Sequence, residues 1–378
     1  MIGNLAWTQL QQLWWIIASL VGSLFLFMTF VQGGQTLLFS VAKNEQEKAL
    51  VLNSIGRKWE LTFTTLVLFG GAMFAAFPLF YATSFGGAYW VWILILLTFV
   101  IQAVSYEYRK KPNNLLGAKT FEMFLFINGS VGLLLIGVAV GTFFTGSNFT
   151  LNEFRAVTWT NPLLGLEAAF SPFNVALGFF LVFLARLLGA LYLVNNLEHS
   201  ELEMRTRKAA FRNLIYSLPF LLYVLYGLLT MKGYAVHPAD GSVFLEQGKY
   251  LHNLLAMPAT LVLLLAGLIL VVWGVVATAF TKKKGGLWLA GPGTVFVGLS
   301  LFLIAGLNNT SFYPSKVDLQ SSLTIYNASS SHYTLTAMSY VALAVPFVLA
   351  YIAFVWRAMD AKKLSVADLE GEQAQDLY

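Results

Sequence analysis

Nine long runs of apolar residues alternate with shorter polar segments along this chain. A helix that crosses a membrane needs about 20 consecutive apolar residues, whereas a strand of a membrane barrel alternates over about 10 residues. The runs are continuous, so the pattern predicts an all-α integral membrane protein with nine transmembrane helices. The predicted spans are residues 13–42, 59–83, 88–106, 119–144, 170–196, 209–231, 253–280, 287–308 and 335–357.

Lysine and arginine residues fall almost entirely into every second gap between these spans. Eighteen of the 23 lie in one set of gaps and four in the other, while Arg186 lies inside a span. Loops rich in Lys and Arg stay on the cytoplasmic side. We therefore expect the N-terminus outside and the C-terminus in the cytoplasm. A missed helix would swap the later loops and abolish the asymmetry, so the charges support the count of nine independently of hydropathy.

The composition fits a protein that lies within a membrane. Of the 378 residues, 58% are hydrophobic and 11% are charged, and the mean hydropathy is +0.70. The net charge of +5 does not indicate a nucleic-acid partner, because the basic residues flank the spans. Cysteine is absent, which excludes disulfides, thiolate zinc sites and iron–sulfur ligation. We expect one polytopic helical domain at 1–357 and a short polar cytoplasmic tail at 358–378.

Four polar residues of the first predicted span share one helical stripe toward its cytoplasmic half. Thr29, Gln32, Gln35 and Thr36 follow the spacing i, i+3, i+6, i+7. Polar groups inside a membrane are costly and often functional. The stripe has two interpretations: hydrogen bonds between helices that hold the bundle together, or a hydrated strip.

Three carboxylates stand at the cytoplasmic border of the spans. Glu60 begins the second span, Glu107 follows the third, and Glu122 opens the fourth. If the first two helices form a hairpin, Glu60 lies at the depth of Gln35. The three acids are candidates for proton uptake, but they also fit an acidic complement to a cation-rich face.

The histidines do not lie where a membrane haem needs its ligands, which project into the bundle at membrane depth. His199 follows the fifth span, His237 and His252 lie in or beside an outer loop, and His332 precedes the ninth span. We therefore expect this chain to carry no haem of its own. We also expect no metal site and no catalytic residue in it. Arg186 lies well inside a span and must face protein, a headgroup or a cofactor, but its partner cannot be named from the sequence.

Ordered motifs across nearly the whole chain closely resemble subunit II of the cytochrome bd quinol oxidases. The most specific is the glycine- and aromatic-rich block from Gly70 to Tyr89. The others are Asn53-Ser-Ile-Gly56, Trp59-Glu60, Tyr106-Glu-Tyr-Arg109, Glu122, Gly189-Ala-Leu-Tyr-Leu193, Arg205-Thr-Arg207 and the segment Ser321–Ser330.

The resemblance implies a subunit of a respiratory complex of the bacterial cytoplasmic membrane that oxidises quinol and reduces dioxygen to water. In that family, subunit I carries the haems b and haem d and the quinol-oxidising loop, while subunit II packs beside it without a haem. The partners implied are therefore subunit I, membrane lipid and, through the complex, quinol; the quinone type and small accessory subunits stay open. Two other interpretations remain: a polytopic transporter, and a scaffold that only assembles subunit I.

The resemblance also implies a share in a cytoplasmic proton path, carried by acids that correspond to Glu60 and to Glu107 and Glu122. The sequence departs from the family at this point. It has Gln32-Gly-Gly-Gln35 where the family has Asp-Gly-x-Asp, and Leu61-Thr-Phe where Gly-Asn-Gln follows Trp-Glu. Glutamine can hold water but cannot titrate. Either waters along Thr29, Gln32, Gln35 and Thr36 continue the path from Glu60, or subunit I supplies the protons and the strip is structural.

Overall fold

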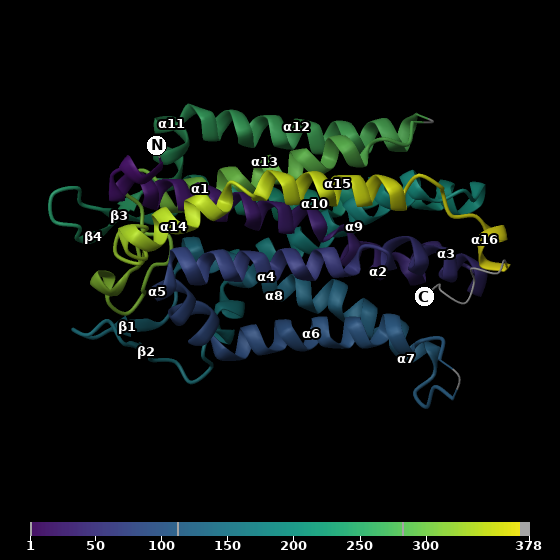
Figure 1. Ribbon diagram of the computed structural model, residues 1–378, viewed down its shortest axis with the longest axis horizontal. Coiled ribbons are helices and arrows are strands. Elements are labelled where there is room, and N and C mark those ends of the chain that lie inside the picture. The colour runs from purple at the N-terminus through teal and green to yellow at the C-terminus, as the bar shows by residue number, and fades with distance from the viewer. Residues whose placement is uncertain (1, 112, 282, 371–378) are drawn as a thin grey trace.

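The structure, a computed structural model, describes residues 2–111, 113–281 and 283–370. Within these ranges, nine helical segments are long and apolar enough to cross a membrane, which confirms the predicted fold class. They lie side by side along the long axis of the molecule (Figure 1). In chain order they are α1 (Trp7–Met28) with α2 (Phe30–Val41), α3 (Glu45–Gly56) with α4 (Trp59–Ala76), α6 (Tyr89–Tyr108), α7 (Ala118–Ile127) with η3 (Asn128–Gly132) and α8 (Leu133–Thr145), α9 (Pro172–Asn196), α10 (Ser200–Thr230), α12 (Pro258–Phe280), α13 (Leu287–Gly306), and α14 (His332–Ala342) with α15 (Val345–Met359).

Two small antiparallel hairpins cap one end of the bundle, and α3, α7 and α16 lie at the other (Figure 1). We call these the outer end and the cytoplasmic end, after the orientation that the cations predict. In the outer cap Phe149 pairs with Trp159 and Tyr234 with Leu245. The shorter elements are η1 (Ile2–Asn4), α5 (Pro78–Tyr81), η2 (Ala82–Gly86), β1 (Phe149–Leu151), β2 (Val157–Trp159), η4 (Leu166–Phe170), β3 (Lys232–Val236), β4 (Val243–Gln247), α11 (Lys249–Ala256), η5 (Leu319–Ser321) and α16 (Val366–Glu370).

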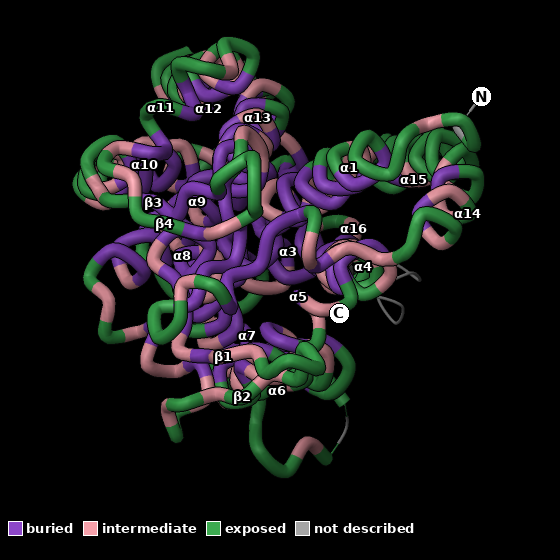
Figure 2. The backbone as a smooth tube through the Cα atoms, turned by 90° about the vertical axis from the view of Figure 1, so that its left-hand side faces the viewer, coloured by how far each residue is buried: buried purple, intermediate pink, exposed green. Residues whose placement is uncertain are grey.

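Helix α9 occupies the centre of the bundle and is buried along most of its length (Figure 2). Its neighbours approach closely because glycines remove side chains from the contacts. A Cβ on Gly33 of α2 would lie 1.8 Å from the carbonyl oxygen of Ala185, and one on Gly137 of α8 would lie 2.4 Å from the Cα of Gly178. The backbones of α2 and α8 therefore touch that of α9 on two sides.

Two helices begin far earlier than hydropathy indicates, because their first turns are polar. The second transmembrane segment starts with α3 at Glu45 rather than at residue 59, and α10 starts at Ser200 rather than at residue 209. Asn44 and His199 cap these starts by accepting hydrogen bonds from the backbone N–H groups of Glu47 and Leu202. Helical structure thus continues beyond the apolar part that a hydropathy pattern detects.

The second segment ends earlier than predicted, since α4 stops at Ala76 rather than at residue 83. Pro78 follows and opens the short helix α5; proline has no backbone N–H to continue the preceding helix. Helix α12 likewise begins at Pro258, so residues 253–256 of the predicted seventh span belong to the separate helix α11.

The ninth segment stands apart from the bundle (Figure 2). Only 6% of its most apolar window is buried, and Trp356 is the one buried residue of α15. The chain after it returns to the bundle: Leu364 is buried, and its backbone N–H donates to Asn196 while its carbonyl accepts from Glu198. Residues 371–378 of the predicted tail lie outside the described residues.

Candidate functional site: a buried line of amides

The polar stripe of the first segment meets polar residues of α6 inside the bundle. Gln32 Nε2 lies 3.4 Å from Gln102 Oε1, and Gln35 Nε2 donates to the Tyr106 hydroxyl at 3.0 Å. All three glutamines are fully buried. The spacing i, i+4, i+8 from Thr98 through Gln102 to Tyr106 puts these residues on one face of α6. We call this row of residues the amide line. Its members are Gln32, Gln35, Thr98, Gln102, Tyr106 and Asn128.

A π-helical turn brings the fourth transmembrane segment against the amide line. Asn128 begins η3, and its Nδ2 lies 3.4 Å from Thr98 Oγ1. Close approach depends on Gly129, where a Cβ would lie 2.1 Å from the carbonyl oxygen of Gln32. Wide turns of this kind inside α-helices are frequent at functional sites.

Several polar atoms of the amide line are buried without a hydrogen-bond partner among the described residues. They are Gln32 Oε1, Gln35 Oε1, Gln102 Nε2 and Asn128 Oδ1. A buried polar group left unpaired costs about 1–3 kcal/mol, and buried water is the usual partner of such groups. These atoms are therefore available to bond buried water where α2, α6 and η3 meet.

An ion-pair network closes the cytoplasmic end of the amide line. Glu122 is 1% exposed, and its carboxylate accepts from Arg109 NH2 at 2.6 Å and from Lys48 Nζ at 3.0 Å. Glu45 also accepts from Lys48, at 2.8 Å. Arg109, the C-cap residue of α6, lies one turn beyond Tyr106, so charged groups continue the face that carries the amides. Glu122 is thus placed as a paired carboxylate at this end.

The other predicted site residues are placed differently. Glu60 and Glu107 are both exposed on this chain. Trp59 stacks on Tyr106 with ring centroids 5.9 Å apart, which puts Glu60 near the depth of Tyr106, at the cytoplasmic end of α6. The hydroxyls of Thr29 and Thr36 donate to carbonyls of their own helix, Leu26 and Gly33. The structure therefore joins Gln32 and Gln35 in one line but leaves Glu60 and Glu107 on the surface.

Arg186 finds its partners within the bundle. Its Nε donates to Asn213 Oδ1 at 3.0 Å and its NH1 to the carbonyl of Thr36 at 3.2 Å, so it joins α9 to α10 and α2. The sequence did not predict these partners of Arg186. It also did not predict that Gln102 and Asn128 belong to the amide line. The signal for these two was available, since each is an uncharged amide inside a predicted span.

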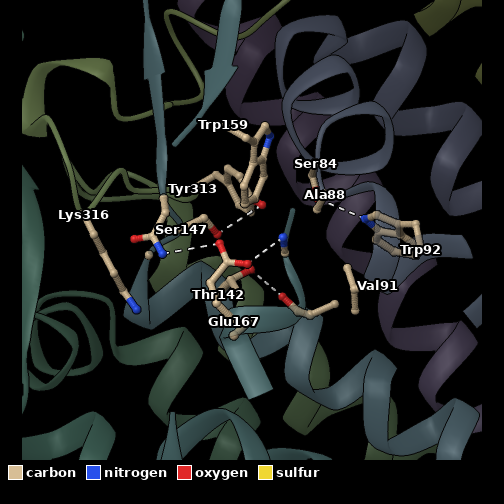
Figure 3. A pocket seen from close by; sticks show the side chains of 15 residues that line it. Ser84, Ala88, Val91, Trp92, Thr142, Ser147, Trp159, Glu167, Tyr313 and Lys316 are labelled. Carbon is tan, nitrogen blue, oxygen red and sulfur yellow. Dashed lines mark hydrogen bonds between the residues drawn. The ribbon is translucent and has the colours of Figure 1, made fainter. Parts of the chain in front are cut away.

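A second polar site lies at the outer end, in a mostly enclosed cavity of about 90 Å³ (Figure 3). Glu167 accepts there from Asn148 Nδ2 at 3.3 Å and from the backbone N–H of Gly165 at 2.8 Å. Loss of water around the ammonium lowers the pKa of Lys316, while the charge of Glu167 acts in the opposite direction. Ligand pockets usually measure about 300–1,000 Å³, so this cavity suits water or a small ion rather than a quinol.

The histidines lie at the ends of helices or in loops. His199 caps α10, His332 Nε2 lies 3.0 Å from the carbonyl of Leu5, and His252 pairs with Glu246 at 2.8 Å. His237 follows β3. They do not converge on a common centre at membrane depth, so they do not fit the ligands of a membrane haem. Over the described residues, no group of three or more His, Asp or Glu side chains could hold a metal ion.

The chain is similar to known proteins over nearly its whole length. The family described as cytochrome bd terminal oxidase subunit II matches residues 10–359. Cytochrome bd-I ubiquinol oxidase subunit 2 of Escherichia coli (strain K12) is 30% identical over 370 residues, covering 93% of this chain and 94% of the relative. Cytochrome bd ubiquinol oxidase subunit 2 of Bacillus subtilis (strain 168) is 28% identical over 353 residues, covering 90% and 93%.

A solved structure, that of the bd oxidase from Geobacillus thermodenitrificans, has a chain of similar fold. The TM-score is 0.68 with 14% identity, covering 93% of this chain and 98% of the other. At that identity the likeness concerns the fold alone. The transporter interpretation gains no support from any of these matches.

Proposed function

The chain belongs to the cytochrome bd terminal oxidase subunit II family, and we propose that it conducts protons from the cytoplasm along the amide line toward its haem-carrying partner. It is a membrane subunit of an oxidoreductase complex of the respiratory chain. We infer that subunit I holds haem b and haem d and oxidises the quinol. The histidines of this chain, dispersed at helix ends, support that division of labour.

Oxygen reduction to water consumes protons as well as electrons, and apolar helices do not pass protons. The observation that carries the proposal is the set of unpartnered amide atoms on Gln32, Gln35, Gln102 and Asn128. Amides do not titrate, so in this chain the proton would move along waters that the amides hold. The line begins at the Glu122–Arg109–Lys48 network and rises along α6 to Thr98.

Glu60 is the proposed collector of protons at the cytoplasmic border. It is exposed, and its neighbour Trp59 stacks on Tyr106, which accepts from Gln35. An unpaired carboxylate can exchange protons with water, whereas Glu122 is held by two cations. Glu107, also exposed on the last turn of α6, is the second candidate for the same task. Thr29 and Thr36 complete the stripe on the first segment but keep their hydroxyls bonded to their own helix.

Glu60→Gln and Glu60→Ala in the assembled oxidase test the collector. With excess quinol, we expect oxygen consumption to fall by about a hundredfold, the lower end of the losses when a positioned proton-transfer group is removed, while haem content stays normal. Glu153→Gln, an exposed carboxylate at the outer end, is the control. Unchanged turnover in both Glu60 variants would remove this residue from the mechanism.

Gln102→Leu tests the amide line itself. It replaces a buried amide by an apolar side chain of similar size, so we expect slower oxygen consumption with haem retained. Gln11→Leu is the matched control, because Gln11 is also buried but donates to the carbonyl of Tyr326 and the hydroxyl of Ser329 in the outer cap. Equal turnover of Gln102→Leu and wild type would assign the line to structure and the proton supply to subunit I.

A further inference from the structure

We propose that the groove between α15 and the bundle binds an anionic phospholipid of the cytoplasmic leaflet. The groove has a volume of about 700 Å³ and lies toward the cytoplasmic end of the ninth segment. This volume is in the range of ligand pockets, about 300–1,000 Å³. The inference does not depend on the proton route, because none of the residues that line the groove belongs to the amide line.

In the described part of the chain, polar contacts tie the ninth segment to the bundle near its two ends. At the outer end, Trp14 Nε1 donates to the carbonyl of Leu335 and to Ser339 of α14. At the cytoplasmic end, Lys58 Nζ pairs with Asp360 at 3.0 Å. Between these ties the side chains of α15 are exposed, with Phe347 79% accessible, and Figure 2 shows α15 apart from the central helices.

The wall of the groove is apolar where acyl chains would lie. Leu349 and Ile352 line it from α15, Phe27 from α1 and Trp288 from α13. Phe27 stacks on Trp356 with ring centroids 6.2 Å apart, so aromatic rings form the floor near the cytoplasmic end. Aromatic residues of this kind are enriched at the membrane–water interface.

The cytoplasmic end of the groove offers donors that lack acceptors. Trp356 is buried, with 8% of its surface exposed. Its indole N–H has no hydrogen-bond partner among the described residues. Arg357 lines the groove and has no ion pair or hydrogen bond to any described side chain or backbone group. A phosphate group would accept from the exposed guanidinium of Arg357, because it offers several anionic oxygens.

Charge at this end favours an anionic headgroup over a neutral one. A neighbouring cavity of about 470 Å³ is lined by Arg57, Lys362 and Lys363. The acids of the two cavities, Asp360 and Asp368, are already bonded to Lys58 and Lys362. Basic pockets on the cytoplasmic side of membrane helices attract anionic lipids, at about 1 kcal/mol per cation near the surface. A neutral quinone ring would leave Arg357 and Lys363 without an anionic partner among the described residues.

Arg357→Gln tests the headgroup contact. The assembled oxidase in nanodiscs of phosphatidylcholine is titrated with phosphatidylglycerol, and bound lipid is counted by native mass spectrometry. We expect the variant to retain phosphatidylglycerol about fivefold more weakly than wild type, with haem content unchanged. Arg212→Gln, an exposed cation of α10 away from the groove, should behave as wild type. Equal retention by Arg357→Gln and wild type would overturn the proposal.

A photoreactive amino acid at Ala353, which lines the groove on α15, identifies the occupant directly. Irradiation of the assembled oxidase in membranes that contain phosphatidylglycerol should give an adduct with the mass of that phospholipid. An adduct with subunit I would mean that protein fills the groove, and an adduct with a quinone would mean a neutral occupant. Either result would overturn the proposal even where Arg357→Gln has an effect.

Discussion

The buried side chains of Gln11 and Gln102 differ in their partners. Gln11 donates to two groups of the outer cap, whereas Gln102 keeps its Nε2 unpaired beside Gln32. Gln32 and Gln35 could be selected from the sequence because polar residues within one helix show their common face. Gln102 and Asn128 become part of the same site only when α2, α6 and η3 pack together. The partners of Arg186 depended in the same way on tertiary contacts.

Lys316 at the outer cavity gives a test of the local environment of one residue. Partial loss of water lowers the pKa of Lys316 from its ordinary value of 10.5. At mildly alkaline pH we therefore expect a larger neutral fraction, and faster acylation by an amine reagent, than for free Nα-acetyl-lysine in the same reaction. Peptide mass spectrometry across a pH series measures the labelling rate at each site.

The variant Glu167→Gln should lower the pKa of Lys316 further, since the carboxylate of Glu167 favours the charged amine. Because folding lowers the pKa of Lys316, the folded chain binds this proton more weakly than the unfolded chain. Stability at this end should therefore rise as the pH passes from the lowered pKa toward 10.5. A labelling midpoint at or above that of the free lysine would contradict the partial loss of water around this amine.

Among the helices, hydropathy predicts where a segment is apolar but not where it ends. The number and order of the spans were predictable because the bilayer requires continuous apolar runs. The polar turns of α3 and the first turns of α10 were missed, since these capped helices continue beyond the apolar run that hydropathy detects. The separate position of α15 could not be predicted either, because its sequence is as apolar as that of the buried α9.

The contact between α2 and α9 should depend on glycine at position 33. In Gly33→Ala, the new methyl would overlap the backbone of Ala185, which cannot move as a flexible side chain can. We expect the free energy of unfolding to fall by about 3 kcal/mol, the upper end of the usual cost of overpacking. The loss should appear as a lower thermal midpoint and a lower yield of haem-containing oxidase. Gly70→Ala is the control, because its Cβ would meet only Phe85, at 3.7 Å. Equal midpoints for the two variants would argue against direct backbone contact.

The whole molecule has two chemically different ends. The two β-hairpins and Lys316 lie at the outer end. The ion-pair network of Glu45, Lys48, Arg109 and Glu122 lies at the other end. The distribution of cations predicts that the second end faces the cytoplasm. The proposed proton uptake and the proposed phospholipid both require this orientation, since the first needs cytoplasmic protons and the second an anionic leaflet.

Single cysteines can measure the orientation because the chain has none of its own. Asp240→Cys lies in the turn between β3 and β4, and Lys110→Cys follows α6; both positions are exposed. We expect a membrane-impermeant maleimide to label Asp240→Cys in intact spheroplasts and Lys110→Cys only after lysis. The unsubstituted chain, separated from subunit I on a gel, gives the background. The reverse pattern would place Glu60 and the ion-pair network outside, and the amide line could then draw no protons from the cytoplasm.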